Sequence, residues 1–157
     1  DLNIDLPSYV NNSSLIISSF CLHWLNEPEK KLRKWYERLA PGGLLIVLFP
    51  NNQSFPEWKV ACKKSNIKYS GITLPCTNTL KSFVKESELF QIKKFSYKQT
   101  FPNIYKLFKS ITNVGAHSTH SERRTIAELK LMQEKWHKDK NKKVNLTWSI
   151  SILILKK

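Results

Sequence analysis

The chain has 157 residues, of which 41% are hydrophobic and 24% are charged. This length and composition are those of a soluble globular protein with one domain, long enough to bury a core. The longest unbroken apolar run, residues 44–49, is far shorter than the roughly 20 residues of a membrane span. No basic segment followed by an apolar segment marks a signal peptide, so the composition predicts a cytoplasmic protein without a membrane partner.

The net charge of +14 at pH 7 predicts an acidic partner, such as nucleic acid, an anionic membrane or an acidic protein. The alternative is a lysine-rich composition with the lysines spread over the surface, and both interpretations stay open. The three cysteines, Cys21, Cys62 and Cys76, are too few and too scattered for a disulfide framework or a zinc site. We therefore expect reduced thiols and no bound metal.

The first predicted elements are a strand, a helix and a second strand. Residues 15–17 and 44–49 are apolar runs typical of buried parallel strands. Between them, residues 27–39 place apolar side chains along one helical face, with Asn26 as the predicted N-cap. "PGG" at residues 41–43 is predicted to stop this helix and turn the chain. A helix that joins two parallel strands gives a right-handed βαβ unit.

The remaining elements follow the same signals of apolar spacing, proline and capping residues. Ser54 is the predicted N-cap of a second helix that reaches about residue 66. The pattern then predicts, in order, an irregular segment over 67–78, a short helix over 79–86, a strand over 90–100, helices over 102–113 and 125–136, and a closing strand over 144–155. The chain contains no internal repeat, and no linker is clear enough to divide it.

Ligands of parallel sheets bind beyond the carboxyl ends of the strands, which here are residues 18–23 and 50–54. Taken alone, His23 is more often a surface or capping histidine than a catalytic one. His117 and His120 have no third ligand at suitable spacing, so a metal site is not expected. Arg123 and Arg124 suit a carboxylate or a phosphate, with a solvated helix start as the alternative.

Longer segments of the sequence resemble a known family. "SSFCLHW" followed by "LNEPEKKLRKWYERLAPGGLLIVLFP" is similar to the later half of class I S-adenosylmethionine (SAM)-dependent methyltransferases. "NNQSFPEW", "YKLFKSITNVGAHSTH", "ELKLMQEKW" and "VNLTWSISILI" resemble the malonyl-carrier-protein O-methyltransferases of biotin synthesis. This resemblance runs from about residue 1 to 155. Relatives that modify a respiratory-complex assembly target share the "LHW" region and stay as competitors.

The resemblance implies a partial Rossmann-like α/β sheet, with helices on both faces and a helical lid. Residues 1–54 would form half of the cofactor-binding core, 55–143 the substrate and lid region with one core strand, and 144–157 the closing strand. The family's glycine-rich cofactor loop precedes the matched region. Because the chain begins at Asp1 rather than Met, we expect a fragment or a processed piece, with the glycine half of the site outside it.

The resemblance also implies the residues of the site. Those expected near the cofactor, SAM, are Asp1, Leu2, Ser18, Ser19, Phe20 and His23. Ser54 is expected to face the transferred methyl group, and His23 and Ser54 are the expected positioning residues. Arg123 or Arg124 is expected to bind the substrate carboxylate or the phosphate of a carrier's phosphopantetheine. No general acid–base pair is identified.

The implied reaction is methylation of the free carboxylate of a malonyl thioester, carried by acyl carrier protein or coenzyme A, in biotin biosynthesis. A carboxylate with a pKa of about 4 is already ionised at pH 7, so the reaction needs alignment and exclusion of water rather than a base. One alternative function is RNA binding or RNA methylation, although no RNA-recognition motif occurs. The other is a truncated, non-catalytic assembly protein that kept the fold.

Overall fold

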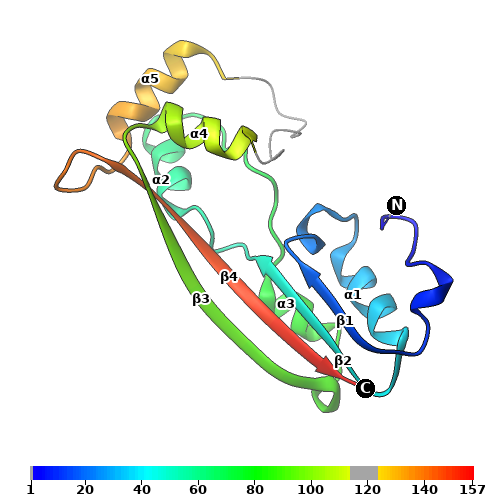
Figure 1. Cartoon of the computed structure of the whole chain (residues 1–157). Coiled ribbons are helices and arrows are strands. Elements are labelled where there is room, and N and C mark those ends of the chain that lie inside the picture. The colour runs from blue at the N-terminus through cyan, green and yellow to red at the C-terminus, as the bar shows by residue number, and fades with distance from the viewer. Residues whose placement is uncertain (1, 114–123) are drawn as a thin grey trace. The chain divides into compact units, whose positions relative to one another are not determined.

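The structure is a computed structural model that describes residues 2–113 and 124–157 (Figure 1). The chain divides into two compact units, each of which is described by itself. The first unit contains Asp1–Ser54, Thr73–Phe95 and Ser149–Lys157, and the second contains Phe55–Ile72 and Ser96–Trp148.

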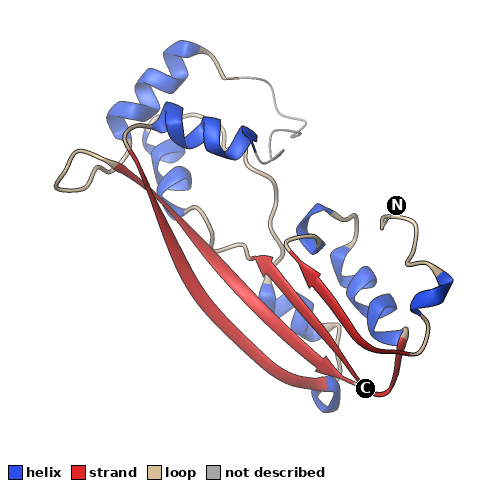
Figure 2. Ribbon diagram, viewed as in Figure 1, coloured by secondary structure: helices blue, strands red, loops and turns tan. Residues whose placement is uncertain are grey.

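One four-stranded sheet has the strand order β1-β2-β4-β3 (Figure 2). Its strands are β1 (Ser13–Ser19), β2 (Leu39–Pro50), β3 (Leu89–Phe101) and β4 (Val144–Lys156). β1 and β2 pair in parallel, as the βαβ prediction requires, and β2 and β4 pair antiparallel. By their residue ranges, β3 and β4 each continue from one unit into the other. The mixed open sheet with helices confirms the predicted α/β fold class.

The glycine turn lies inside the first part of β2 rather than before it. Ser13 pairs with Leu39 and Leu15 with Leu44, so four residues of β2 bulge out between these pairs. Gly42 has a φ of +77°, a conformation that glycine adopts without strain. A Cβ at Gly43 would lie 2.9 Å from the carbonyl oxygens of Ala40 and Ser13. The prediction that "PGG" stops the helix is therefore wrong, because the helix ends at Glu37 and β2 already begins at Leu39.

The helix between β1 and β2, α1 (Pro28–Glu37), packs its apolar face into the core of the first unit. Leu32, Trp35 and Tyr36 are buried there as the helical spacing predicts. The N-cap is Glu27 and not Asn26, and Glu27 has a φ of +51°. The predicted cap fails because Pro28 occupies the first helical position and disfavours the helical conformation of the residue before it. The N–H of Asn26 instead donates to Oδ1 of Asn3.

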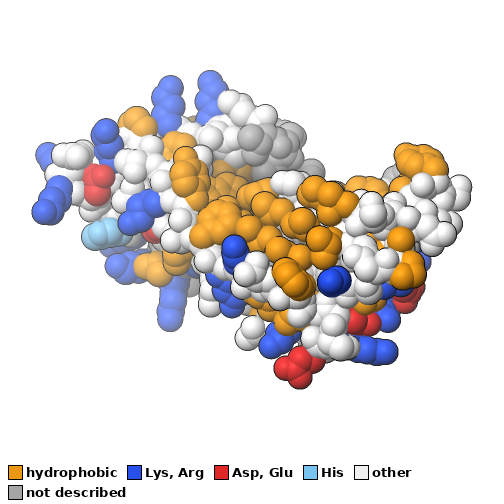
Figure 3. All heavy atoms as spheres, turned by 60° about the horizontal axis from the view of Figure 1, so that its bottom comes forward, with side chains coloured by type: hydrophobic (Ala, Val, Ile, Leu, Met, Phe, Trp, Pro, Cys, Tyr) orange, Lys and Arg blue, Asp and Glu red, His pale blue; other side chains and the backbone are white. Residues whose placement is uncertain are grey.

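The core of the first unit lies on one face of the sheet. The buried strand residues of this face are Leu45, Val47, Phe49, Leu153 and Leu155, and the second helix that contributes to the cluster, α3 (Thr77–Ser82), adds Leu80. The alternate residues of β1 point the other way, and Leu15 and Ile17 remain 50% and 60% exposed. Figure 3 shows hydrophobic side chains gathered over one face of the molecule. Part of the apolar sheet surface therefore remains open.

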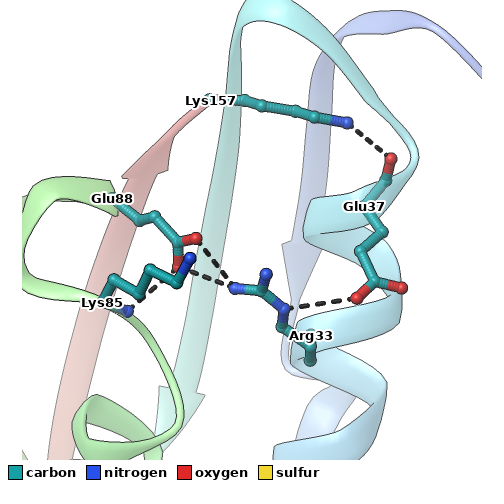
Figure 4. A network of polar contacts seen from close by, with 5 residues as sticks. All are labelled: Arg33, Glu37, Lys85, Glu88 and Lys157. Carbon is teal, nitrogen blue, oxygen red and sulfur yellow. Dashed lines mark hydrogen bonds and ion pairs between the residues drawn. The ribbon is translucent and has the colours of Figure 1, made fainter.

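A polar network joins the C-terminal half of α1 to Glu88 and to Lys157 (Figure 4). Nη1 of Arg33 donates to both carboxylate oxygens of Glu88, at 2.9 and 2.7 Å, and Nε lies 3.3 Å from Oε1 of Glu37. Burial opposes the ionisation of Glu88, but the Lys85 N–H and Arg33 outweigh it and lower the pKa of Glu88. Nζ of Lys157 donates to the carbonyl oxygen of Glu37 at 2.7 Å, which joins the chain's last residue to α1.

The second unit is built on three helices and a group of aromatic rings. The helices are α2 (Pro56–Lys64), α4 (Ile104–Asn113) and α5 (Ile126–Lys135), and α5 contacts both α2 and α4. The ring of Trp58 lies 4.9 Å from those of Tyr69 and Phe108. Thr125 caps α5, since its hydroxyl accepts the N–H of Glu128 while that carboxylate accepts the N–H of Thr125. Aromatic rings therefore pack in this interior beside aliphatic residues of the helices and of β4, which include Leu107, Met132 and Leu146.

Candidate functional site

The candidate site is the edge of the sheet where β1 and β2 both end, and it lies in the first unit. Because the strands are parallel, their carboxyl ends meet at the same edge. The chain leaves β1 through Phe20, whose N–H donates to the carbonyl oxygen of Leu48 at 2.9 Å. A single 3-10 turn, Leu22–Trp24, follows. The fold therefore collects the residues just after β1 beside the end of β2.

Ser18 and Phe20 present different groups at this edge. Ser18 is buried, and its Oγ has no hydrogen-bond partner within the described parts of the chain. Phe20 has a φ of +51°, an uncommon conformation for a residue with a side chain, and the residue is 39% exposed. Backbone strain of this kind concentrates at functional sites. Ser19 lies between them and is exposed. The edge thus offers a buried hydroxyl and an accessible aromatic ring.

His23 lies within the 3-10 turn and packs against two aromatic rings. Its ring is edge-on to that of Phe20 at 6.2 Å and tilted against that of Trp24 at 5.0 Å. Burial lowers the pKa of His23 from 6.5 to about 4, so the imidazole is neutral at pH 7. Its Nδ1 is buried and has no partner among the described residues. A neutral ring nitrogen in this position can donate or accept one hydrogen bond.

The segment after β2 is held by a buried polar bridge. Nδ2 of Asn51 donates to Oγ of Ser151 at 2.8 Å, and Oγ1 of Thr77 lies 2.8 Å from the same oxygen. All three residues are at most 4% exposed. Oδ1 of Asn51 also accepts the N–H of Gln53. The bridge holds the segment after β2 against β4 and α3. The sequence did not predict it, because the partners are 74 and 100 residues apart.

Ser54 is fully buried and joins β2's end to β4. Its Oγ donates to the carbonyl oxygen of Ser149 and accepts the N–H of the same residue, both at 2.9 Å. This pairing explains why Ser54 is not the N-cap of α2, which the sequence predicted; the N-cap is Phe55, at a φ of +63°. A contact of Ser54 with the substrate stays a prediction, and the geometry gives its hydroxyl a structural role.

The remaining predicted site residues are Asp1, Leu2, Arg123 and Arg124. Leu2 belongs to the first unit and is 37% exposed, and Arg124 belongs to the second unit. Asp1 and Arg123, together with His117 and His120, lie outside the described residues. The structure therefore brings together Ser18, Ser19, Phe20 and His23 in one short segment. Their expected contact with a cofactor stays a prediction.

The groups at this edge suit a nucleoside in kind. Two buried polar atoms without described partners, Oγ of Ser18 and Nδ1 of His23, can pair with ligand atoms, and the ring of Phe20 can pack against a base. The four glycines of the sequence stand at positions 42, 43, 71 and 115, so no glycine-rich loop follows β1 or β2. The described residues contain no cluster of His, Cys, Asp and Glu that could hold a metal ion.

Comparison with known proteins finds similar folds but no similar sequence family. Neither a model of a protein family nor a curated protein matches the chain. Among solved structures, BH2331 of Bacillus halodurans C-125, a protein provisionally assigned as a methyltransferase, is similar with a TM-score of 0.59 and 12% identity. The similarity covers 96% of this chain and 73% of BH2331. YcgJ of Bacillus subtilis is similar with a TM-score of 0.57 and 10% identity, over 97% of this chain and 67% of YcgJ.

At these identities the comparison establishes the fold, which is the Rossmann-like α/β fold of methyltransferase-like proteins. This similarity agrees with the predicted α/β fold class. No helix within the described residues is long and apolar enough to cross a membrane.

Proposed function

We propose that the chain is the later part of a SAM-dependent methyltransferase domain and that the edge formed by β1 and β2 binds the adenosine side of the cofactor. One observation carries this proposal. A buried hydroxyl and a buried imidazole nitrogen without described partners stand beside an accessible aromatic ring, at the carboxyl ends of two parallel strands. The similarity of fold to BH2331 supports it.

The residues of the edge have separate roles in this proposal. The ring of Phe20 packs against the adenine, and Oγ of Ser18 and Nδ1 of His23 pair with polar atoms of the nucleoside. The bridge through Asn51 holds the opposite side of the edge in place. When bound, the cofactor supplies a sulfonium methyl group that an ionised carboxylate can accept without a general base. The task of the protein is then to orient the two reactants and exclude water.

We further propose that the substrate is the free carboxylate of a malonyl thioester on acyl carrier protein or coenzyme A, as in biotin biosynthesis. The segments quoted above, from "NNQSFPEW" to the closing strand, support this assignment. The net charge of +14 suits an acidic carrier protein in the cytoplasm. Arg123 and Arg124 are the proposed ligands of the substrate carboxylate or the carrier's phosphate.

Calorimetric titration with S-adenosylhomocysteine tests cofactor binding. We expect saturable binding that Phe20→Ala weakens about tenfold and Ser18→Ala severalfold, because each variant removes one contact to the nucleoside. Phe90→Ala and Ser14→Ala are matched controls, since both replace exposed residues of the same unit away from the edge. Absence of binding, or equal losses in the controls, would contradict the proposed cofactor site.

Substrate choice is tested separately. Incubation with labelled SAM and malonyl-carrier protein, malonyl-coenzyme A or RNA should give a labelled methyl ester only with the malonyl thioesters. Labelled RNA would favour the RNA-methylating alternative instead. Cofactor binding without transfer to any of the three would favour a non-catalytic protein that retained the fold.

A further inference from the structure

The second unit carries most of the positive charge of the protein. It contains 15 of the 26 Lys and Arg residues but only 5 of the 12 Asp and Glu residues. Of the net charge of +14, +10 therefore belongs to this unit. An even spread of lysines over the surface does not account for this difference, so the second unit is the part of the chain in which an acidic partner should bind.

The charge is densest in the loop that joins α5 to β4, residues 135–143, which we call the lysine turn. Its five lysines are all exposed, and they are Lys135, Lys138, Lys140, Lys142 and Lys143. None of the five forms an ion pair with another described residue. In Figure 1 this loop extends past the beginning of β4. The five positive charges are therefore accessible to a partner.

Hydrogen bonds hold the backbone of the lysine turn in one conformation. Oδ1 of Asp139 accepts the N–H groups of Asn141 and Lys143, at 2.9 and 2.8 Å. The N–H of Asp139 donates to the carbonyl oxygen of Lys143 at 2.8 Å, and Lys138 and Val144 form a β-bridge at the base of the turn. The only carboxylate of the turn is thus used to shape it, and the lysines stand on a fixed backbone.

The lysine side chains do not contribute to this framework. Their ammonium groups make no hydrogen bond to another described residue, and the bonds that shape the turn use backbone atoms and Asp139. Like charges held close together repel one another and lower the stability of the folded protein. The fold therefore carries a cost at this turn without a structural return, and binding of an acidic partner accounts for it.

The composition of the lysine turn favours a carboxylate-rich protein surface over nucleic acid. The turn contains no arginine, the residue that pairs with phosphates through two parallel hydrogen bonds. Its only Phe, Tyr or Trp residue, Trp136, is 2% exposed and donates from Nε1 to the carbonyl oxygen of Asn145, so it cannot stack on a base. Lysines are flexible, hydrated point charges, which attract an acidic protein and form weak, reversible pairs with its carboxylates.

We propose that the lysine turn is the docking surface for the acidic face of an acyl carrier protein. The surface follows from the second unit alone, and the choice of this carrier rests on the proposed function. The lysines dock the carrier and bring no group to the reaction, so docking is measurable without methyl transfer. Methylation of malonyl-coenzyme A without carrier docking would overturn this inference and leave the proposed function standing. Docking without any methylation would do the reverse.

The first test titrates the isotope-labelled protein with apo acyl carrier protein and follows the backbone amide signals by nuclear magnetic resonance. The apo carrier has neither phosphopantetheine nor an acyl group, so only its protein surface can bind. We expect the largest shifts within residues 135–143 and a fall in affinity of about tenfold from low to physiological salt.

The second test removes three charges from the lysine turn. The turn variant combines Lys138→Gln, Lys140→Gln and Lys143→Gln. We expect it to bind the apo carrier about tenfold more weakly, because each exposed ion pair contributes little by itself and three are lost together. It should unfold at the same urea concentration as the unchanged protein or a higher one, because the repulsion between the lysines is reduced.

The matched control removes the same number of charges from exposed positions of the first unit. It combines Lys81→Gln, Lys93→Gln and Lys94→Gln. Its net charge equals that of the turn variant, so a difference in affinity between the two depends on where the charges lie. The control should bind the carrier nearly as tightly as the unchanged protein does.

The inference is overturned if the apo carrier does not bind, if its largest shifts lie outside the lysine turn, or if the control loses as much affinity as the turn variant. Tighter binding of single-stranded RNA or of anionic vesicles to the same residues would also overturn it, in favour of a different partner. The titration of the unchanged protein decides the matter even if a variant folds poorly.

Discussion

At the scale of single residues, the burial of His23 makes the stability of the folded protein depend on pH. The folded protein keeps this imidazole neutral down to a pKa of about 4, whereas an unfolded chain protonates it near 6.5. Between these values the unfolded state binds more protons than the folded state. The stability of the folded state is therefore unaffected above about pH 6.5 and falls as the pH drops toward 4.

Replacing His23 by Gln should remove most of this loss on the acid side. We expect the acid-induced decrease in unfolding free energy between pH 6.5 and 4 to be smaller by about 1–2 kcal/mol, a value already reduced for the partial exposure of the ring. Urea denaturation at several pH values measures it. His137→Gln, at an exposed position, is the matched control. Equal pH profiles for the unchanged protein and His23→Gln would contradict the prediction.

At the scale of elements, the polar bridge between the end of β2, β4 and α3 depends on one hydroxyl group, that of Ser151. Ser151→Ala leaves Nδ2 of Asn51 and Oγ1 of Thr77 without the hydroxyl they share. We expect a loss of about 1–3 kcal/mol in unfolding free energy, because these groups stay buried. Ser149→Ala is the control, since its hydrogen bonds to Ser54 use backbone atoms only. A loss of the same size in both variants would argue against the bridge.

The two faces of the sheet should respond differently to the same substitution. Leu45 of β2 is fully buried and Leu15 of β1 is 50% exposed. Leu45→Ala should cost about 2–5 kcal/mol of unfolding free energy, as for other core leucines, and Leu15→Ala below about 1 kcal/mol. Thermal or chemical denaturation of the two variants compares them directly. A cost at Leu15 as large as that at Leu45 would mean that the open face is covered in solution.

At the scale of the whole molecule, the net charge of +14 predicts that the rate of association with an acidic partner depends on salt. If the partner is an acyl carrier protein, association should slow about tenfold from low to high salt, while dissociation changes little. Stopped-flow mixing at several salt concentrations measures both rates. Salt-independent association would show that the lysines are merely spread over the surface, which is the other interpretation of the composition.

The local sequence determined the elements and much of the edge of the sheet. Apolar runs and helical spacing were enough to predict β1, β3, β4, α1 and α5 within a few residues, because these patterns depend on neighbours in the chain. The parallel pairing of β1 and β2 followed from the helix between them, and it brought Ser18, Phe20 and His23 to one edge as expected. The N-caps at Asn26 and Ser54 were wrong because proline and a distant strand decided those helix starts.

The tertiary structure alone decided which polar groups are paired. Asn51 meets Ser151 across 100 residues of sequence, Ser54 meets Ser149 across 95, and Arg124 reaches the loop after α2 across 54 residues to Ser70. No local pattern encodes such pairs, since they depend on how the strands and helices fold back on one another. The sequence thus determined which two strand ends share an edge of the sheet, and only the folded chain shows how the polar groups around that edge are paired.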